Sequence, residues 1–380
     1  MGIGGMKNYS LAILAGDGIG PEVIGEAVKV VDKAGEEFGF SVKKTAFPFG
    51  AEYYLQHGKA LPESAFKEMG GHDAMLLGAI GDPRVKPGPL EQEILLALRF
   101  HFDQYVNLRP ATAFPGVPLP VALKKGERLD VVVVRENTED LYMGLGGSGK
   151  GSYHARLAAK RGLYDFAGGV EVGLPESVES AFSIGMMTRG GVERITRYAF
   201  ELAKKRGEKK VYVVSKANAV PHLYGFWDGV TRETAAKEFP EIEYAPVNVD
   251  AACYLMARQP AGWGVVLCPN LFGDIVSDLL SALAGGLGLA AAGNIGDGLS
   301  MFEPVHGSAP TIAGTGKANP LAAILSASLM LSHIGEEPAA KAVEEAVRAY
   351  LSSNKPQPVE QGGSAACGEV GALVCGFIKA

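Results

Sequence analysis

The chain has 380 residues, of which 47% are hydrophobic and 21% charged, with a formal net charge of −6. This is the composition of a globular protein. The length is enough for two lobes, because single hydrophobic cores stop growing near roughly 250–300 residues. The acidic balance and the lack of a long basic run exclude nucleic acid and anionic membranes as expected partners.

The targeting and cysteine patterns favour a protein of the reducing cytoplasm. The opening residues lack the apolar core of a signal peptide, and no apolar run approaches the ~20 residues of a membrane span. The four cysteines contain no C-x-x-C pair, so neither a zinc site nor a disulfide framework is expected. We therefore expect a cytoplasmic protein.

The first segments alternate between short apolar strands and amphipathic helices. Residues 9–31 predict a strand, a glycine-rich turn, and a helix with Pro21 in its first turn. Pro21 also takes the place of the third glycine, so the turn is not the G-x-G-x-x-G dinucleotide fingerprint. Strands at residues 41–49 and 74–80 and a helix at residues 92–102 follow.

The same alternation continues to the end of the chain. Apolar strands at residues 131–134 and 211–214 each lead directly into polar residues. Residues 144–153 are rich in glycine and predict a loop or a projecting arm. After residue 301 a loop and two helices are expected. Strands alternating with helices throughout predict the α/β class.

Residues 270–283 predict an amphipathic helix with Asp274 and Asp278 on one face. Carboxylates at i and i+4 lie about 6 Å apart and repel each other unless a cation or another partner neutralises them. One interpretation is half of a magnesium-type site, with Asp250 at the end of another strand as a third ligand. The alternative is two solvated acids.

Arg99, Arg109 and Arg135 lie among apolar neighbours, which predicts that they are partly desolvated. Arginine binds carboxylates and phosphates through its rigid donor fork. Each could form a structural ion pair, but three together indicate a small polyanionic substrate. Tyr142 follows Arg135 by seven residues and could donate a proton.

Three further features carry weaker signals. Lys216 ends a strand without other charges and could act as a base, or it could be an exposed loop lysine. Residues 144–151 nearly match a phosphate loop containing Lys150, but Gly151 stands where the metal-binding hydroxyl is needed. His306 has no second histidine nearby, which favours a packed or hydrogen-bonding role over a metal ligand.

These residues lie in motifs that resemble the metal-dependent β-decarboxylating dehydrogenases, a family with 3-isopropylmalate, isocitrate, homoisocitrate and tartrate branches. The motifs follow in family order and cover nearly the whole chain: GDGIGPE, LRFHFDQYVNLRP, VRENTEDLY, SKAN, NLFGDIVSD and MFEPVHGSAP. LLGAIGDP and the run before NLRP are most similar to the 3-isopropylmalate branch. RENTEDLY also occurs in the isocitrate and homoisocitrate branches.

The resemblance implies a two-domain α/β fold with mixed sheets flanked by helices and a cofactor site that is not a Rossmann site. Residues 1–104 and 285–380 would form a discontinuous cofactor-binding domain. Residues 105–284 would bind substrate and metal, carry an arm, and form a homodimer. Lys216 and Asp250 would then reach into the active site of the partner subunit.

The resemblance also implies roles for single residues. Arg99, Arg109 and Arg135 would bind the carboxylates of a 2-hydroxy diacid, while Lys216 would accept the hydroxyl proton and Tyr142 would protonate the enolate after CO2 leaves. The metal ligands for Mg²⁺ or Mn²⁺ would be Asp274, Asp278 and the partner's Asp250, which also belongs to the substrate site. The residues implied at the cofactor are Glu303, His306, Gly307, Ser308, Ala309 and Asn319, with Asn218 near the nicotinamide.

At two places the sequence departs from the patterns of related branches, and these places bear on cofactor and substrate specificity. Thr311 stands where NAD-using relatives carry an aspartate, and the Lys-Tyr pair of NADP-using isocitrate enzymes is missing too, so NAD is favoured with Lys317 as the one nearby exception. Leu95 and Leu96 offer an apolar wall, where isocitrate enzymes carry Ser and Asn at the positions of Glu93 and Leu95.

The expected reaction is therefore the oxidative decarboxylation of 3-isopropylmalate to 2-oxoisocaproate with reduction of NAD. The alternative is the same chemistry on isocitrate, homoisocitrate, tartrate or another alkylmalate. Two other classes are alternatives: a phosphoryl-transfer protein that uses Lys150, and a non-catalytic paralogue. The paralogue is disfavoured because every metal carboxylate and Lys216 are retained.

Overall fold

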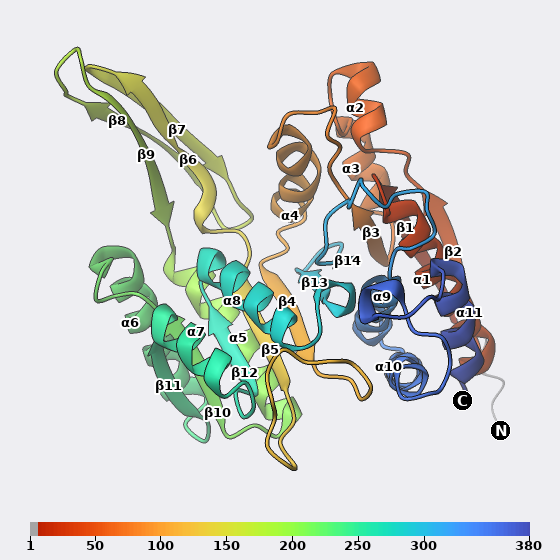
Figure 1. Cartoon of the computed structure of the whole chain (residues 1–380). Helices are drawn as coiled ribbons and strands as arrows, with labels where there is room; N and C mark the ends of the chain where they lie inside the picture. The colour runs from red at the N-terminus through yellow and green to blue at the C-terminus, as the bar shows by residue number, and fades with distance from the viewer. Residues whose placement is uncertain (1–6) are drawn as a thin grey trace.

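The computed structural model describes residues 7–380, which form a mixed α/β structure around one large sheet (Figure 1). The sheet has ten strands in the order β11-β10-β12-β5-β4-β13-β14-β3-β1-β2. The pairs β4–β5, β4–β13 and β13–β14 are antiparallel, and the other pairs are parallel. The strands are β1 (Lys7–Gly16), β2 (Phe40–Ala46), β3 (Ala74–Ala79), β4 (Val106–Thr112), β5 (Asp130–Glu136), β10 (Lys210–Ser215), β11 (Glu243–Asn248), β12 (Val265–Cys268), β13 (Ala291–Ile295) and β14 (Met301–Pro304).

Helices cover both faces of the sheet, which confirms the predicted α/β class. They are α1 (Gly20–Phe38), α2 (Ala51–His57), α3 (Glu63–Met69), α4 (Ala97–His101), α5 (Arg189–Arg206), α6 (Pro221–Glu238), α7 (Val249–Arg258), α8 (Asn270–Leu283), α9 (Leu321–His333), α10 (Glu337–Leu351) and α11 (Cys367–Phe377). None of those between residues 7 and 380 is long and apolar enough to cross a membrane.

Within residues 7–380, the N-terminal and C-terminal segments lie together on one side of the molecule, and the middle of the chain forms the other side (Figure 1). We call the half with β1–β3, β13, β14, α1–α4 and α9–α11 the terminal lobe. The half with β4, β5, β10–β12 and α5–α8 is the central lobe. The boundaries implied by the resemblance, at residues 104 and 285, stay a prediction.

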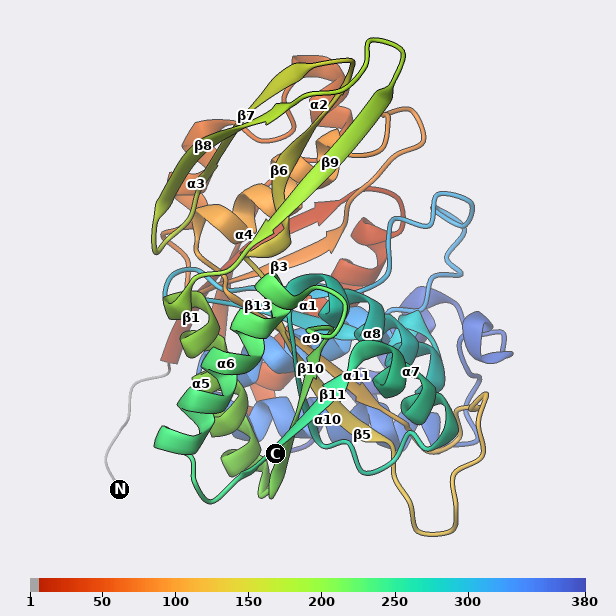
Figure 2. The same cartoon turned by 90° about the vertical axis from the view of Figure 1, so that its left-hand side faces the viewer.

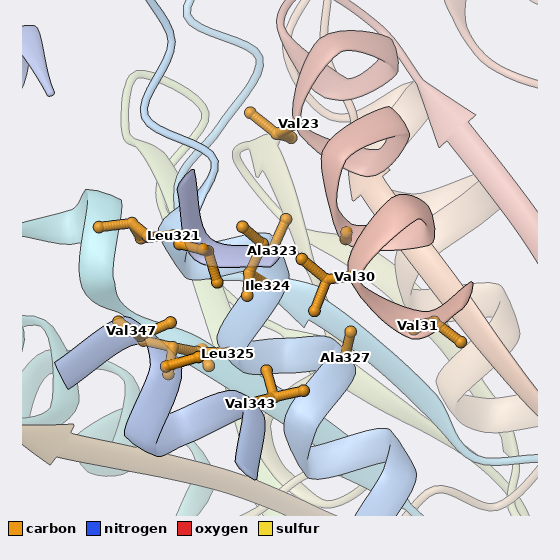
Figure 3. Close-up of a cluster of buried hydrophobic side chains, with 14 of the residues drawn as sticks. Val23, Val30, Val31, Leu321, Ala323, Ile324, Leu325, Ala327, Val343 and Val347 are labelled. Carbon is orange, nitrogen blue, oxygen red and sulfur yellow. The ribbon is translucent and has the colours of Figure 1, made fainter. Parts of the chain in front are cut away.

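Each lobe has an apolar core on both faces of the sheet. In the terminal lobe, α1, α9, α10 and α11 pack on one face, whereas α2, α3 and α4 pack on the other. The valines of α1 lie at helical spacing and meet the apolar side chains of α9 and α10 (Figure 3). In the central lobe, α5 and α6 cover one face, and α7 and α8 cover the other.

An arm of two hairpin-like sheets projects from the central lobe (Figures 1 and 2). It pairs β6 (Asp140–Lys150) with β9 (Glu179–Met186), and β7 (Tyr153–Lys160) with β8 (Asp165–Val172). Residues 144–150 are therefore strand, not loop, and glycine is required because a Cβ at Gly146 would lie 2.4 Å from the carbonyl oxygen of Phe182. A phosphate loop needs a turn that opens a helix, so this strand rules out that role for Lys150.

Three other segments differ from the predicted elements. The expected helix at residues 92–102 is a π-helical turn, Glu91–Leu96, followed by α4. Residues 170–207 predict one strand and a long helix, but two strands of the arm, β8 and β9, precede α5. The C-terminal region holds a third helix, α11. The π-helical turn matters for the site, because such turns change which side chains face one side of a helix.

Candidate active site between the two lobes

The three predicted arginines are buried on the sheet face that α8 and α4 cover. Arg109 comes from β4, Arg135 from the end of β5 and Arg99 from α4, and they are 8%, 1% and 3% exposed. Alternation along β4 and β5 directs Arg109 and Arg135 to this face, while their sequence neighbours Leu108 and Val134 pack toward α5. Two strands of the central lobe and one helix of the terminal lobe thus bring the three arginines to one region.

Both acids of α8 meet these arginines. Arg135 Nη1 lies 2.5 Å from Asp274 Oδ1, and Arg109 Nη1 lies 3.1 Å from the same oxygen and 3.4 Å from Asp278 Oδ1. Burial alone would raise the pKa of Asp274, but Arg135 and Arg109 hold that pKa below its usual range. Burial raises the pKa of Asp278, and Arg109 offsets this only in part. Asp274 is therefore an ion-paired acid, whereas Asp278 has only the longer contact to Arg109.

Arg99 has a different partner. Its Nη2 donates to Glu303 Oε1 at 3.0 Å, and both side chains are buried. Within the described residues, Arg99 Nε and Arg135 Nη2 are buried without a hydrogen-bond partner. Unpaired buried donors are rare and costly, so they mark places where an anionic ligand would complete the structure.

A cavity of about 130 Å³ adjoins Arg99 and Arg109. Leu95 lines this cavity, and Leu96, which is half-buried, does not. Glu91 lines it as well, which the sequence analysis missed. The available signal was its spacing, because Glu91 precedes Leu95 by four residues and Arg99 by eight.

Tyr142, at the base of the arm, joins the same cluster. Its hydroxyl donates to Asp274 Oδ2 at 2.6 Å, and its ring lies beneath the guanidinium of Arg135, with 4.9 Å between Cζ and the ring centre. Burial raises the pKa of Tyr142, and so does the hydrogen bond to Asp274. The hydroxyl therefore carries its proton at neutral pH.

Lys216 and Asp250 form a separate pair at the edge of the central lobe. Lys216 Nζ lies 2.5 Å from Asp250 Oδ1, and this contact lowers the pKa of Asp250. The Asp250 side chain is 68% exposed. Within residues 7–380 of one chain, no three His, Cys, Asp or Glu residues are grouped to hold a metal ion. One chain thus brings together Asp274 and Asp278, but not Asp250.

The predicted cofactor loop follows β14 and packs against the turn before α1. Ile19 N donates to the carbonyl of Ser308 at 2.9 Å, and a Cβ at Gly18 would lie 2.0 Å from that oxygen. The G-x-G-x-G turn is thus needed for a close approach of two backbones. Ala309 has φ +40°, which costs a non-glycine residue energy and is typical of functional loops.

His306 and Asn319 lie near the two ends of this loop. His306 Nδ1 is 3.0 Å from the carbonyl oxygen of Gly307, and its Nε2 is buried without a partner in the described structure. Burial lowers the pKa of His306. Asn319 Nδ2 donates to Glu360 Oε2 at 2.9 Å, a carboxylate that the sequence analysis missed. Asn218 is exposed in the turn between β10 and α6.

Fold and site together define an α/β enzyme with an arginine-lined cavity beside two helical carboxylates. The chain belongs to the isocitrate/isopropylmalate dehydrogenase family, whose family model matches residues 10–374. The 3-isopropylmalate dehydrogenase of Thermobifida fusca is 44% identical over 344 residues, which are 90% of each chain.

Solved structures agree with this assignment. The isocitrate dehydrogenase from Methylococcus capsulatus superposes with a TM-score of 0.84 at 33% identity, covering 98% of this chain and all of the other. A β-decarboxylating dehydrogenase from Thermococcus kodakarensis gives a TM-score of 0.74 at 34% identity, with 97% and 96% covered. The similarity thus extends over both lobes.

Proposed function

We propose that the protein catalyses the oxidative decarboxylation of 3-isopropylmalate to 2-oxoisocaproate, a step of leucine biosynthesis, with NAD and Mg²⁺ or Mn²⁺. The observation that carries this proposal is the convergence of buried Arg109 and Arg135 on Asp274, next to the Leu95 cavity. The name and 44% identity of the Thermobifida fusca relative favour this substrate over isocitrate.

The acids of α8 fit a divalent cation. Mg²⁺ and Mn²⁺ prefer carboxylate oxygens, and Asp274 and Asp278 present them one helical turn apart. The Asp278 side chain is 55% exposed and held only by a 3.4 Å contact to Arg109, so it can turn toward a cation at small cost. Burial raises the pKa of Asp278 and Arg109 offsets this only in part, so a cation beside this carboxylate would stabilise its charged form.

The chain's own residues have distinct tasks. When bound, a divalent cation supplies Lewis-acid polarisation of the 2-hydroxyl and its carboxylate, and NAD supplies the hydride acceptor. Arg99, Arg109 and Arg135 orient the substrate by its carboxylates. Tyr142 keeps its proton and donates it to carbon after CO2 leaves.

Lys216 would take the 2-hydroxyl proton in a neighbouring subunit. In one chain, Lys216 and Asp250 contact each other and not the acids of α8. Tyr254 and Leu255 on α7 follow Asp250 by four and five residues, and Ile275 on α8 directly follows Asp274; all three are exposed apolar residues. A homodimer that buries these apolar residues would bring Lys216 and Asp250 of one chain to the two acids of α8 in the other chain. We place this dimer in the cytoplasm.

NAD is the cofactor that the loop favours. Thr311 and Lys317 are both exposed, and Lys317 is the one cation of the loop that could meet a 2′-phosphate. Glu360 lies against Asn319, which adds negative charge where a 2′-phosphate would be unfavourable. Turnover is therefore expected to be higher with NAD than with NADP.

One assay tests the proposal. NADH formation is followed with Mg²⁺ and a panel of 3-isopropylmalate, malate, tartrate, isocitrate and homoisocitrate. We expect kcat/KM for 3-isopropylmalate to exceed that for each other hydroxy acid of the panel by about tenfold or more, since an apolar pocket discriminates by this amount. Higher kcat/KM for isocitrate or homoisocitrate would overturn the substrate, and no turnover of any hydroxy acid in the panel would overturn the reaction.

A further inference from the structure

Three buried asparagines lie where the lobes share the large sheet. Asn107 is on β4, Asn137 follows β5 and Asn294 is on β13, and all three are at most 1% exposed. Asn294 is directly opposite Asn107 in the antiparallel β13–β4 ladder, so the two side chains leave the same face of the sheet. At such burial each amide must find its partners within the protein.

The amide hydrogen bonds run in one direction from Arg109 to Glu303. Arg109 Nε donates to Asn107 Oδ1 at 3.0 Å. Asn107 Nδ2 donates to Asn294 Oδ1 at 3.1 Å, and Asn294 Nδ2 donates to Glu303 Oε1 at 2.8 Å. Arg99 Nη2 donates to the same carboxylate oxygen at 3.0 Å. The chain of bonds thus joins an arginine of the central lobe to the arginine–glutamate pair of the terminal lobe.

Asn137 locks the orientation of the other two amides. Its Nδ2 donates to Asn294 Oδ1 at 3.0 Å and to the carbonyl of Gln104 at 2.9 Å, and its Oδ1 accepts from Asn107 Nδ2 at 3.2 Å. Asn294 Nδ2 also reaches the carbonyl of Met301 at 3.4 Å. Every amide hydrogen has an acceptor, and hydrogen bonds aligned in this way strengthen one another.

A neutral amide suits this position better than a carboxylate would. Arg109 must keep its positive charge to bind an anionic substrate, and Asn107 Oδ1 fixes the guanidinium without cancelling that charge. We propose that Asn107 and Asn294 are positioning residues, which set Arg109 relative to the Arg99–Glu303 pair. The two guanidinium groups, one from each lobe, are thereby spaced for the carboxylates of a small diacid. This inference rests on the proposed function.

The test replaces Asn107 with its isosteric acid. Asn107→Asp places a carboxylate beside Arg109 Nε and removes the donors to Asn137 and Asn294. We expect KM for 3-isopropylmalate to rise roughly ten- to a hundredfold, because hydrogen bonds to charged groups are involved. The arginine binds the same carboxylate before and during the reaction, so kcat should fall less than KM rises.

Gln104→Glu is the matched control. It also turns a buried amide into a carboxylate, but the Gln104 side chain donates to the carbonyl of Leu299 at 2.8 Å and has no hydrogen bond to an arginine or to Glu303 in the described structure. Its Tm should fall as much as that of Asn107→Asp, whereas its KM should change by less than about threefold. Equal rises of KM in the two variants, or an unchanged KM in Asn107→Asp, would overturn the positioning role.

Calorimetric binding of 3-isopropylmalate in the presence of Mg²⁺ and without NAD separates this inference from the proposed function. We expect Kd to rise with KM in Asn107→Asp. A wild-type protein that binds the diacid without oxidising it would contradict the proposed reaction, and the Kd comparison would still decide the positioning role. If Asn107→Asp does not fold, Asn107→Ala should raise Kd at least about fivefold by freeing Arg109 Nε, and an unchanged Kd would contradict the inference.

Discussion

The hydroxyl of Tyr142 donates a 2.6 Å hydrogen bond to Asp274, and the other oxygen of that carboxylate faces Arg135 at 2.5 Å. Asp274 therefore links the candidate proton donor to the candidate substrate-binding arginine. Because Arg135 is 1% exposed, its charge depends on this acid in the absence of a ligand. Asp278 has no comparable partner, which makes the two acids of α8 unequal.

We predict that the two acids differ in their effect on stability. Asp274→Asn should lower the free energy of unfolding by about 2 kcal/mol, because it leaves Arg135 with an uncompensated buried charge and the acid is only partly exposed. Asp278→Asn should stay within about 0.5 kcal/mol of wild type, since its charged form is disfavoured by burial. Urea unfolding without metal measures both values.

Mn²⁺ provides the second half of this test. Saturating Mn²⁺ should raise the Tm of the wild type by binding the folded state, and both variants should lose that increase. An Asp278→Asn variant that keeps the full Mn²⁺ effect would show that Asp278 is not a metal ligand.

Tyr142→Phe should reduce kcat by roughly 10²–10⁴-fold, the range for a lost general acid. The ring beneath Arg135 remains, so Kd for 3-isopropylmalate should stay within about threefold of wild type. Tyr153→Phe is the control, because Tyr153 lies on the arm with its hydroxyl near Ser180. A kcat loss that is equal in both variants would contradict the role of Tyr142.

Leu95→Asn should lower kcat/KM for 3-isopropylmalate more than for malate, which has no branched side chain. The expected loss for 3-isopropylmalate is about ten- to a hundredfold, because Leu95 lines the cavity beside Arg99. Leu96→Asn should have a smaller effect, since Leu96 does not line that cavity. Equal losses with both substrates would show that Leu95 does not face the alkyl group.

The parts of the site carried by single elements could be predicted from the sequence. Helical spacing placed Asp274 and Asp278 on one face of α8, and apolar strands that end in polar residues marked Arg135 and Lys216. Apolar flanks also predicted the burial of Arg109. Each of these inferences needs only the local period of a helix or strand.

Contacts between distant segments could not be predicted in this way. Asn107 and Asn294 are 187 positions apart, and only the strand order β4-β13 makes them neighbours. The partner of Asn319, Glu360, lies in a turn 41 residues later. The π-helical turn Glu91–Leu96 was not predicted either, because a period of 3.6 residues does not distinguish it from an α-helix.

His306 gives a prediction for the dependence of stability on pH. Its folded-state pKa lies below the unfolded value of 6.5, because burial disfavours the charged ring and Nε2 has no partner in the described structure. The unfolded chain therefore binds a proton first as pH falls. His306 therefore does not lower the free energy of unfolding above pH 6.5, where the ring is neutral in both states, and it lowers this free energy as the pH drops below 6.5.

The free energy of unfolding should thus fall more between about pH 7.5 and about pH 5.5 in the wild type than in His306→Gln. His222→Gln, at an exposed histidine of α6, should keep the wild-type slope. Identical slopes for wild type and His306→Gln would show that His306 titrates alike in the folded and unfolded chain.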